Sequence, residues 1–157
     1  KGSGKDENKR APMYWSKDDK AEGMCKGPAD MEDFQMKFDS LEEQQEDPDS
    51  IYNYVKQVIR VRNQNPVIAR GTTAYLEQYS GEQCFALTRS YEGSNLLLLG
   101  NTSAEAVSVD LTGLTVGGTT AEELVLLGEL YTGEETAERA GTVVTLPAYS
   151  ILILGEE

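Results

Sequence analysis

Seven short stretches rich in β-branched, aromatic and leucine residues follow one another in the second half of the chain, with turn-forming residues between them. They cover residues 75–79, 83–91, 96–101, 106–111, 124–130, 142–146 and 149–154. Strands at intervals of about ten residues, without helices between them, are typical of an antiparallel sandwich or barrel. The pattern therefore predicts a mainly β fold, an antiparallel Greek-key β-sandwich.

One long helix is predicted just before these strands. Asp47-Pro48 offers an N-cap carboxylate followed by a proline at the first helical position, and Pro66 ends the helix. Its apolar residues recur at spacings of three and four: Ile51, Tyr54, Val55, Val58 and Ile59. Such a helix is about 24 Å long. Its apolar stripe must be covered by another layer.

Residues 1–50 differ from the rest because they are polar, are interrupted by glycine and proline, and carry only scattered large apolar side chains. That composition is typical of a long loop with a few anchors. The predicted organisation is thus a loop and helix followed by a β-sandwich. Cys25 and Cys84 stand far apart, without C-x-x-C spacing, and we expect them to be unpaired.

The charge pattern excludes several function classes. The 157 residues include 14 Lys and Arg, 27 Asp and Glu, and no His, giving a net charge of −13. Without imidazole there is no Ser-His-Asp or Cys-His unit and no His-ligated zinc, so hydrolytic chemistry would rest on carboxylates.

The charge is also unevenly distributed. Residues 1–70 hold 12 basic and 14 acidic groups, whereas residues 71–157 hold 2 basic and 13 acidic ones. Neither part forms a basic patch, so we expect neither nucleic acid nor a membrane surface as a partner. No apolar run reaches the ~20 residues of a membrane span, and no apolar signal-peptide region follows the first charges. The sequence leaves the compartment open.

Several possible sites have a simpler structural interpretation. Gly2-Ser3-Gly4-Lys5 resembles the end of a phosphate-binding loop, but Asp6 stands where a magnesium-binding Ser or Thr is needed. Paired carboxylates such as Asp18-Asp19 form neither a calcium-loop motif nor a defined sugar cleft. We therefore expect no cofactor and no metal.

Two aromatic features leave alternatives open. One group of tyrosines in the β part offers either a sugar-stacking platform or packing at strand ends. Its members are Tyr75, Tyr79, Tyr91, Tyr131 and Tyr149. Residues 10–16 gather a cation, a proline and the only tryptophan, which suits either an anchor or the wall of a ligand site.

Four segments, in order, carry a resemblance to a known family. Residues 10–15 read Arg-Ala-Pro-Met-Tyr-Trp, residues 40–54 contain Ser-Leu-Glu-Glu-Gln and Asp-Pro-Asp-Ser, residues 60–71 contain Arg-Val-Arg-Asn and Ala-Arg-Gly, and residues 146–150 read Leu-Pro-Ala-Tyr-Ser. In order and spacing they resemble the end of glycoside hydrolase family 13, the α-amylase family.

The resemblance implies an architecture. Residues 1–70 would be the tail of a (β/α)₈ barrel, comprising the loop after strand eight and the last barrel helix, and residues 71–157 the antiparallel sandwich called domain C. The family's catalytic Asp, Glu and second Asp lie on earlier barrel strands. None of the carboxylates here would then be catalytic.

The implied function is that of a non-catalytic C-terminal fragment of an enzyme acting on α-glucans, which supports and caps the barrel. Because barrel active sites lie on loops after the strands, we expect Asp6, Glu7, Arg10 and Trp15 near the rim of the substrate cleft. The implied partners are the missing barrel and the α-glucan substrate.

Two other functions stay open, a starch-binding β-sandwich module and a free-standing small enzyme. The isolated fragment should also hide its helix stripe, because large exposed apolar patches are rare on monomers. It would do so by folding residues 1–45 over the stripe or by self-association.

Overall fold

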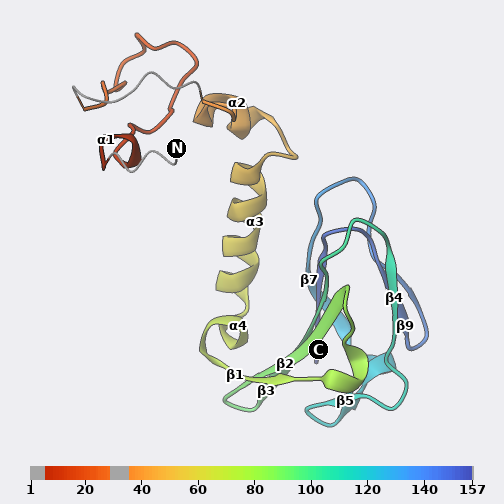
Figure 1. Cartoon of the computed structure of the whole chain (residues 1–157). Coiled ribbons are helices and arrows are strands. Elements are labelled where there is room, and N and C mark those ends of the chain that lie inside the picture. Colours follow the sequence, from red (N-terminus) through yellow and green to blue (C-terminus); the bar gives the residue numbers. More distant parts are fainter. Residues whose placement is uncertain (1–5, 29–35, 157) are drawn as a thin grey trace. The chain divides into compact units, whose positions relative to one another are not determined.

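The computed structural model describes residues 6–28 and 36–156, and the chain divides into two compact units, Lys1–Asn53 and Tyr54–Glu157 (Figure 1). Each unit is described by itself. The boundary predicted at residue 71, between barrel tail and sandwich, stays a prediction.

The first unit contains two short helices, α1 (Asp6–Lys9) and α2 (Leu41–Glu46), joined by loops. Helix α2 begins at a capping box in which the Ser40 side chain accepts a hydrogen bond from the Glu43 N–H and the Glu43 carboxylate accepts one from the Ser40 N–H. The next free amides of α2 bond to a distant loop, because Leu41 N donates to Tyr14 O at 2.9 Å and Glu42 N to Trp15 O at 3.1 Å. The start of α2 thereby holds the loop that contains Trp15.

The long helix α3 spans Ile51–Gln64, so the start predicted at Asp47-Pro48 is wrong. Asp47 ends α2, and its side chain accepts from Asp49 N at 3.0 Å, closing a turn. Ser50 takes the capping role, since its Oγ accepts from Asn53 N at 3.2 Å. Fourteen residues give α3 a length of about 21 Å.

Pro66 does stand where the long helix stops, and it also opens a further short helix, α4 (Pro66–Arg70). Proline suits the first turn of a helix, where its missing N–H leaves no bond unmade. No helix in the described part of the chain is both long and apolar enough to cross a membrane.

The second unit is the predicted antiparallel β-sandwich. Its larger sheet has the order β1-β2-β3-β10-β7, with β1 Thr72–Tyr75, β2 Cys84–Tyr91, β3 Ser94–Asn101, β10 Ile151–Gly155 and β7 Val125–Leu130. The facing sheet has the order β4-β9-β8, with β4 Val107–Asp110, β9 Val143–Leu146 and β8 Glu138–Ala140. A small hairpin pairs β5 Thr115–Val116 with β6 Thr119–Thr120.

Two details differ from the sequence prediction. The stretch predicted as a strand over residues 75–79 is the end of β1 followed by a 3₁₀ turn, η1 (Glu77–Tyr79). The hairpin of β5 and β6, the turn η2 (Ala121–Glu123) and the three-residue β8 were not predicted. Each is too short to show a hydrophobic period.

The middle of the larger sheet, at β3 and β10, is covered on both faces, which explains the unbroken leucine runs of these two strands. Leu97, Leu99 and Leu152 belong to the core between the two sheets, whereas Leu96 and Ile153 belong to a second core beneath α3. In a half-exposed strand every second residue would be polar. The runs at residues 96–99 and 151–154 are apolar throughout because both sides are buried.

Candidate functional site

The predicted rim residues lie on the loop and helix of the first unit. Asp6 and Arg10 form an ion pair, with 3.1 Å between Asp6 Oδ2 and Arg10 Nε, and both side chains are mostly exposed. One helical turn brings them together. The Trp15 side chain is 45 % exposed although its backbone is bonded to α2. The Glu7 side chain lies outside the described residues.

A cleft opens beside this loop, with a volume of 330 Å³. Its lining comes from the two segments that α2 joins: Tyr14, Lys17, Met36, Lys37, Phe38, Asp39 and Glu43. The rings of Tyr14 and Phe38 meet edge to face, with centroids 6.5 Å apart and planes at 75°. Within the same lining Lys17 Nζ lies 3.2 Å from Glu43 Oε1.

The charged pair in the cleft is ionised at neutral pH. Hydrogen bonds from the Ser40 side chain and backbone, and then from Lys17, lower the pKa of Glu43. The hydrogen bond to Glu43 raises the pKa of Lys17. Because the capping box fixes Glu43, this pair has one defined position in the cleft.

The sequence interpretation missed Lys17, Phe38 and Glu43. Lys17 and Glu43 are 26 residues apart, and no periodic pattern reports a contact over that distance. One local signal was present, since Ser40 and Glu43 have the S-x-x-E spacing of a capping box. That spacing places Glu43 on the first turn of a helix, although it does not predict the partner.

The sandwich tyrosines do not share one platform, because three of the five make separate internal contacts. The Tyr79 hydroxyl donates to Thr112 O at 3.2 Å, Arg70 lies 5.9 Å from the Tyr91 ring centre, and the Tyr131 hydroxyl donates to Glu129 at 2.5 Å. Tyr75 and Tyr149 remain 57 % and 52 % exposed. Tyr149 also has a φ of 49°, a costly conformation for a bulky residue.

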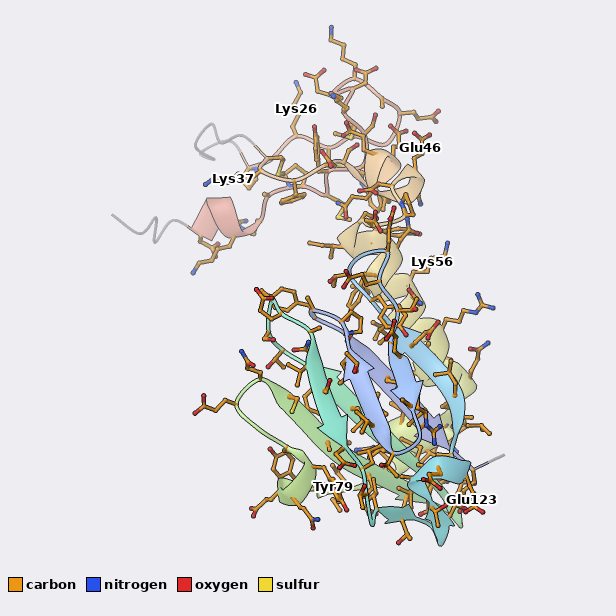
Figure 2. All side chains as sticks on the ribbon, turned by 90° about the vertical axis from the view of Figure 1, so that its right-hand side faces the viewer. Lys26, Lys37, Glu46, Lys56, Tyr79 and Glu123 are labelled. Carbon is orange, nitrogen blue, oxygen red and sulfur yellow. The ribbon has the colours of Figure 1, made fainter. Side chains whose placement is uncertain are left out.

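The described residues contain no group of three or more His, Cys, Asp or Glu side chains placed to hold a metal ion. The labelled lysines in Figure 2, Lys26, Lys37 and Lys56, all precede the sandwich, as the charge pattern of the sequence requires.

The helix stripe predicted from the sequence divides into two parts. Tyr54 and Val58 pack in the core beneath α3, whereas Val55 and Ile59 are 45 % and 52 % exposed, and Ile51 is 76 % exposed. At 100° per residue, Val55 and Ile59 lie on one side of Val58 and Gln57 lies on the other. Gln57 donates to Glu129 O of β7, the edge strand. Val55 and Ile59 therefore lie on the side of α3 that is opposite Gln57 and its contact with β7.

The helix-facing surface of the larger sheet also carries apolar side chains. Leu87 pairs with Leu98 and with Tyr75, and Phe85 pairs with Gly100, so their side chains share the helix-facing surface of the sheet. None of Tyr75, Phe85 and Leu87 belongs to the core beneath α3. Tyr75 is exposed, and Phe85 and Leu87 are half-buried. We call these three, with Val55 and Ile59, the uncovered apolar face.

Comparison with known proteins identifies the fold. No family model and no curated protein matches the chain. Among solved structures, Amy13B of Eubacterium rectale matches 100 % of this chain with a TM-score of 0.88 and 39 % identity. Trehalulose synthase MutB from Pseudomonas mesoacidophila MX-45 matches 74 % with a TM-score of 0.58 and 25 % identity. An α-amylase from H. orenii matches 76 % with a TM-score of 0.59 and 23 % identity, which shows the fold alone.

The chain spans only 29 % of the length of Amy13B, 19 % of MutB and 23 % of the H. orenii enzyme. The sandwich and the helix before it match Amy13B over the whole of this chain, and this match defines the chain as part of a glycoside hydrolase. The chain belongs to the α-amylase family, glycoside hydrolase family 13, and corresponds to a C-terminal portion of such an enzyme.

Proposed function

We propose that this chain is the non-catalytic C-terminal part of an enzyme that acts on α-linked glucose polymers or oligomers, and that it supports and caps the catalytic barrel. The observation that carries the proposal is the uncovered apolar face. It combines exposed apolar side chains of α3 with apolar side chains of β1 and β2, a composition typical of a buried interface.

The occupant that we propose for this face is the barrel part of the same enzyme. Amy13B has a large additional portion that this chain does not match. Because α3 packs on the sandwich through Tyr54 and Val58, its exposed Val55 and Ile59 would let the same helix also contact the barrel. In the isolated chain, folding back of residues 1–45 or self-association would have to cover the same side chains.

The test is a chimera in which this chain replaces the matching portion of Amy13B. The chimera should be soluble and should act on the substrate that Amy13B itself uses. Val55→Asp and Ile59→Asp should each lower soluble yield and activity in the chimera, because they place a charge in the interface, while the isolated chain stays folded. The control is Leu126→Asp, since Leu126 is 54 % exposed and pairs with Leu154 of the other core.

Two results would contradict the proposal. One is a remainder of Amy13B that is as soluble and as active without any C-terminal portion. The other is a chimera in which the two interface variants behave like Leu126→Asp.

We propose further that Asp6, Glu7, Arg10 and Trp15 lie at the rim of the substrate cleft of the whole enzyme. The support is the exposure of the Arg10 and Trp15 side chains on a loop whose backbone is fixed by α2. Arg10→Ala in the chimera should lower kcat/KM on the α-glucan tested, and an unchanged value on every α-glucan would contradict this role.

A second candidate function is starch binding by the sandwich itself. Exposed Tyr75 and Tyr149 are the observation that favours it, because an exposed aromatic ring suits the apolar face of a sugar. Affinity electrophoresis in an amylopectin gel separates the two functions. Retardation that Tyr75→Ala or Tyr149→Ala removes would support sandwich binding, and an unretarded chain would exclude it.

A further inference from the structure

The lining of the cleft in the first unit combines two chemically different kinds of side chain. Two of the side chains are aromatic, since Tyr14 and Phe38 lie edge to face, and Phe38 remains 61 % exposed. Two others form the charged pair Lys17–Glu43, which is fixed through Ser40. A ring serving only as an internal anchor would be buried, so the exposure of Phe38 leaves its apolar surface open to a ligand.

The charges in the cleft favour a neutral ligand. Its lining contains two cations, Lys17 and Lys37, and two anions, Asp39 and Glu43. Their sum is zero, so neither a phosphate nor a metal ion has a net electrostatic reason to bind there. Ammonium groups donate hydrogen bonds and carboxylates accept them. A hydroxyl-bearing molecule meets both requirements, since each hydroxyl donates and accepts.

The size of the cleft agrees with a small ligand. Its 330 Å³ lies at the lower end of the ~300–1,000 Å³ found for small-molecule sites. Lys17 also keeps hydrogen-bonding capacity, because an ammonium group has three N–H donors and the Lys17 contact with Glu43 uses one. The Asp39 backbone is fixed as well, since its carbonyl accepts from Gln44 Nε2 at 2.8 Å.

We propose that this cleft is an auxiliary binding site for a glucose unit of an α-glucan, with the sugar stacked on Phe38 and its hydroxyls bonded to Lys17 and Asp39. The choice of an α-glucan rests on the proposed function, whereas the choice of a neutral sugar rests on the cleft itself. The site adds Phe38, Lys17 and Asp39 to the four proposed rim residues, and its Tyr14 directly precedes Trp15 on the loop that α2 holds.

Calorimetric titration with maltoheptaose tests the site, using both the 157-residue chain and the chimera with Amy13B. Phe38→Ala should weaken binding at least tenfold, and Phe38→Leu, which keeps an apolar side chain but removes the flat ring, should weaken it several-fold. Lys17→Met should also weaken binding. Matched controls are Met13→Ala and Leu126→Ala, because both residues are exposed and neither lines the cleft. Tyr75→Ala is measured in parallel to detect binding by the sandwich. Circular dichroism verifies that each variant folds.

The outcomes separate this site from the proposed function. Weakening by the Phe38 variants with unchanged binding by the controls supports the site. Unchanged binding in the Phe38 variants, loss of binding only in Tyr75→Ala, or no binding by either protein overturns it. In each of those cases the activity of the chimera still decides the proposed function, because that activity does not depend on an auxiliary site.

Discussion

The two units of the chain differ in what they bury. In the described part of the first unit, the buried residues are three serines, Ser16, Ser40 and Ser50. In the second unit they are predominantly leucine, valine, isoleucine and alanine, gathered in two cores. The first unit is therefore specified by hydrogen bonds at helix ends and turns, and the second by apolar packing.

This difference in buried residues indicates how far each unit is stable without a partner. Buried hydroxyls fix local geometry but contribute little net free energy, because folding exchanges their bonds to water for bonds to protein. Burial of apolar area supplies most of the stability of a domain. We infer that the sandwich is stable by itself, and that the first unit is organised locally and gains stability from a partner.

The largest expected effect is the loss of a leucine from the core between the sheets. Leu97 is 0 % exposed, and Leu97→Ala should lower the free energy of unfolding by about 3 kcal/mol, the lost transfer energy plus the cavity. Urea denaturation followed by circular dichroism measures the change. Leu126→Ala, at an exposed position on β7, is the matched control and should have an effect below about 1 kcal/mol. Equal losses of stability in Leu97→Ala and Leu126→Ala would contradict the conclusion that apolar packing stabilises the sandwich.

A smaller effect is expected where a ring lies on a glycine. A Cβ at Gly100 would lie within van der Waals overlap of the Phe85 ring, so Gly100→Ala must displace that ring. Overpacking of this kind costs roughly 2 kcal/mol. The double variant Gly100→Ala, Phe85→Ala should lose less than the sum of the two single variants. Gly133→Ala is the control, because nothing lies near that position.

The two capping boxes allow the same substitution in both units. Ser40 and Glu43 cap α2, and Thr120 and Glu123 cap η2. Thr120→Ala should lower the stability of the sandwich by about 1 kcal/mol. Ser40→Ala should leave the sandwich unfolding transition unchanged and instead speed hydrogen exchange and proteolysis over residues 36–46. A lowered sandwich transition in Ser40→Ala would contradict the independence of the two units.

The smallest effect concerns alkaline pH. Burial, and then the hydrogen bond to Glu129, raises the pKa of Tyr131 from 10.0 to about 12. The folded state keeps the proton that the unfolded state loses, so this contribution is complete below pH 10.0 and is lost as the pH rises to about 12. Stability measured across this range should fall less steeply in Tyr131→Phe. If stability falls with the same slope in the unaltered chain and in Tyr131→Phe, groups other than Tyr131 cause the fall.

The sequence predicted the sandwich well because its signal is local and repeated. Alternating hydrophobicity and turn-forming residues predicted most strands, and only elements of two or three residues, such as β5, were not predicted. The start of the long helix was wrong for a specific reason. Asp47 and Ser50 are both good caps, and only the turn closed by Asp47 onto Asp49 decides that Ser50 caps α3.

The candidate site was harder to predict, because its contacts join segments that are distant in sequence. Arg10 and Trp15 are predicted through a resemblance, whereas Phe38 and Lys17 become candidates only because α2 bonds to the loop at Tyr14. The second covered face of the larger sheet was likewise visible only as unbroken leucine runs. Such runs indicate burial on both sides, but they do not tell which element covers them.

The position of Trp15 has an optical consequence. The chain has one tryptophan, and it lies on the loop held by α2, so tryptophan fluorescence reports the first unit, whereas the sandwich contributes only tyrosine emission. Tryptophan emission from one unlabelled sample thus follows the first unit alone, whereas tyrosine emission comes mainly from the second unit, which holds six of the eight tyrosines. If the partner barrel orders the first unit, the tryptophan signal alone should change when the barrel is added, and the tyrosine signal should record whether the sandwich was already complete.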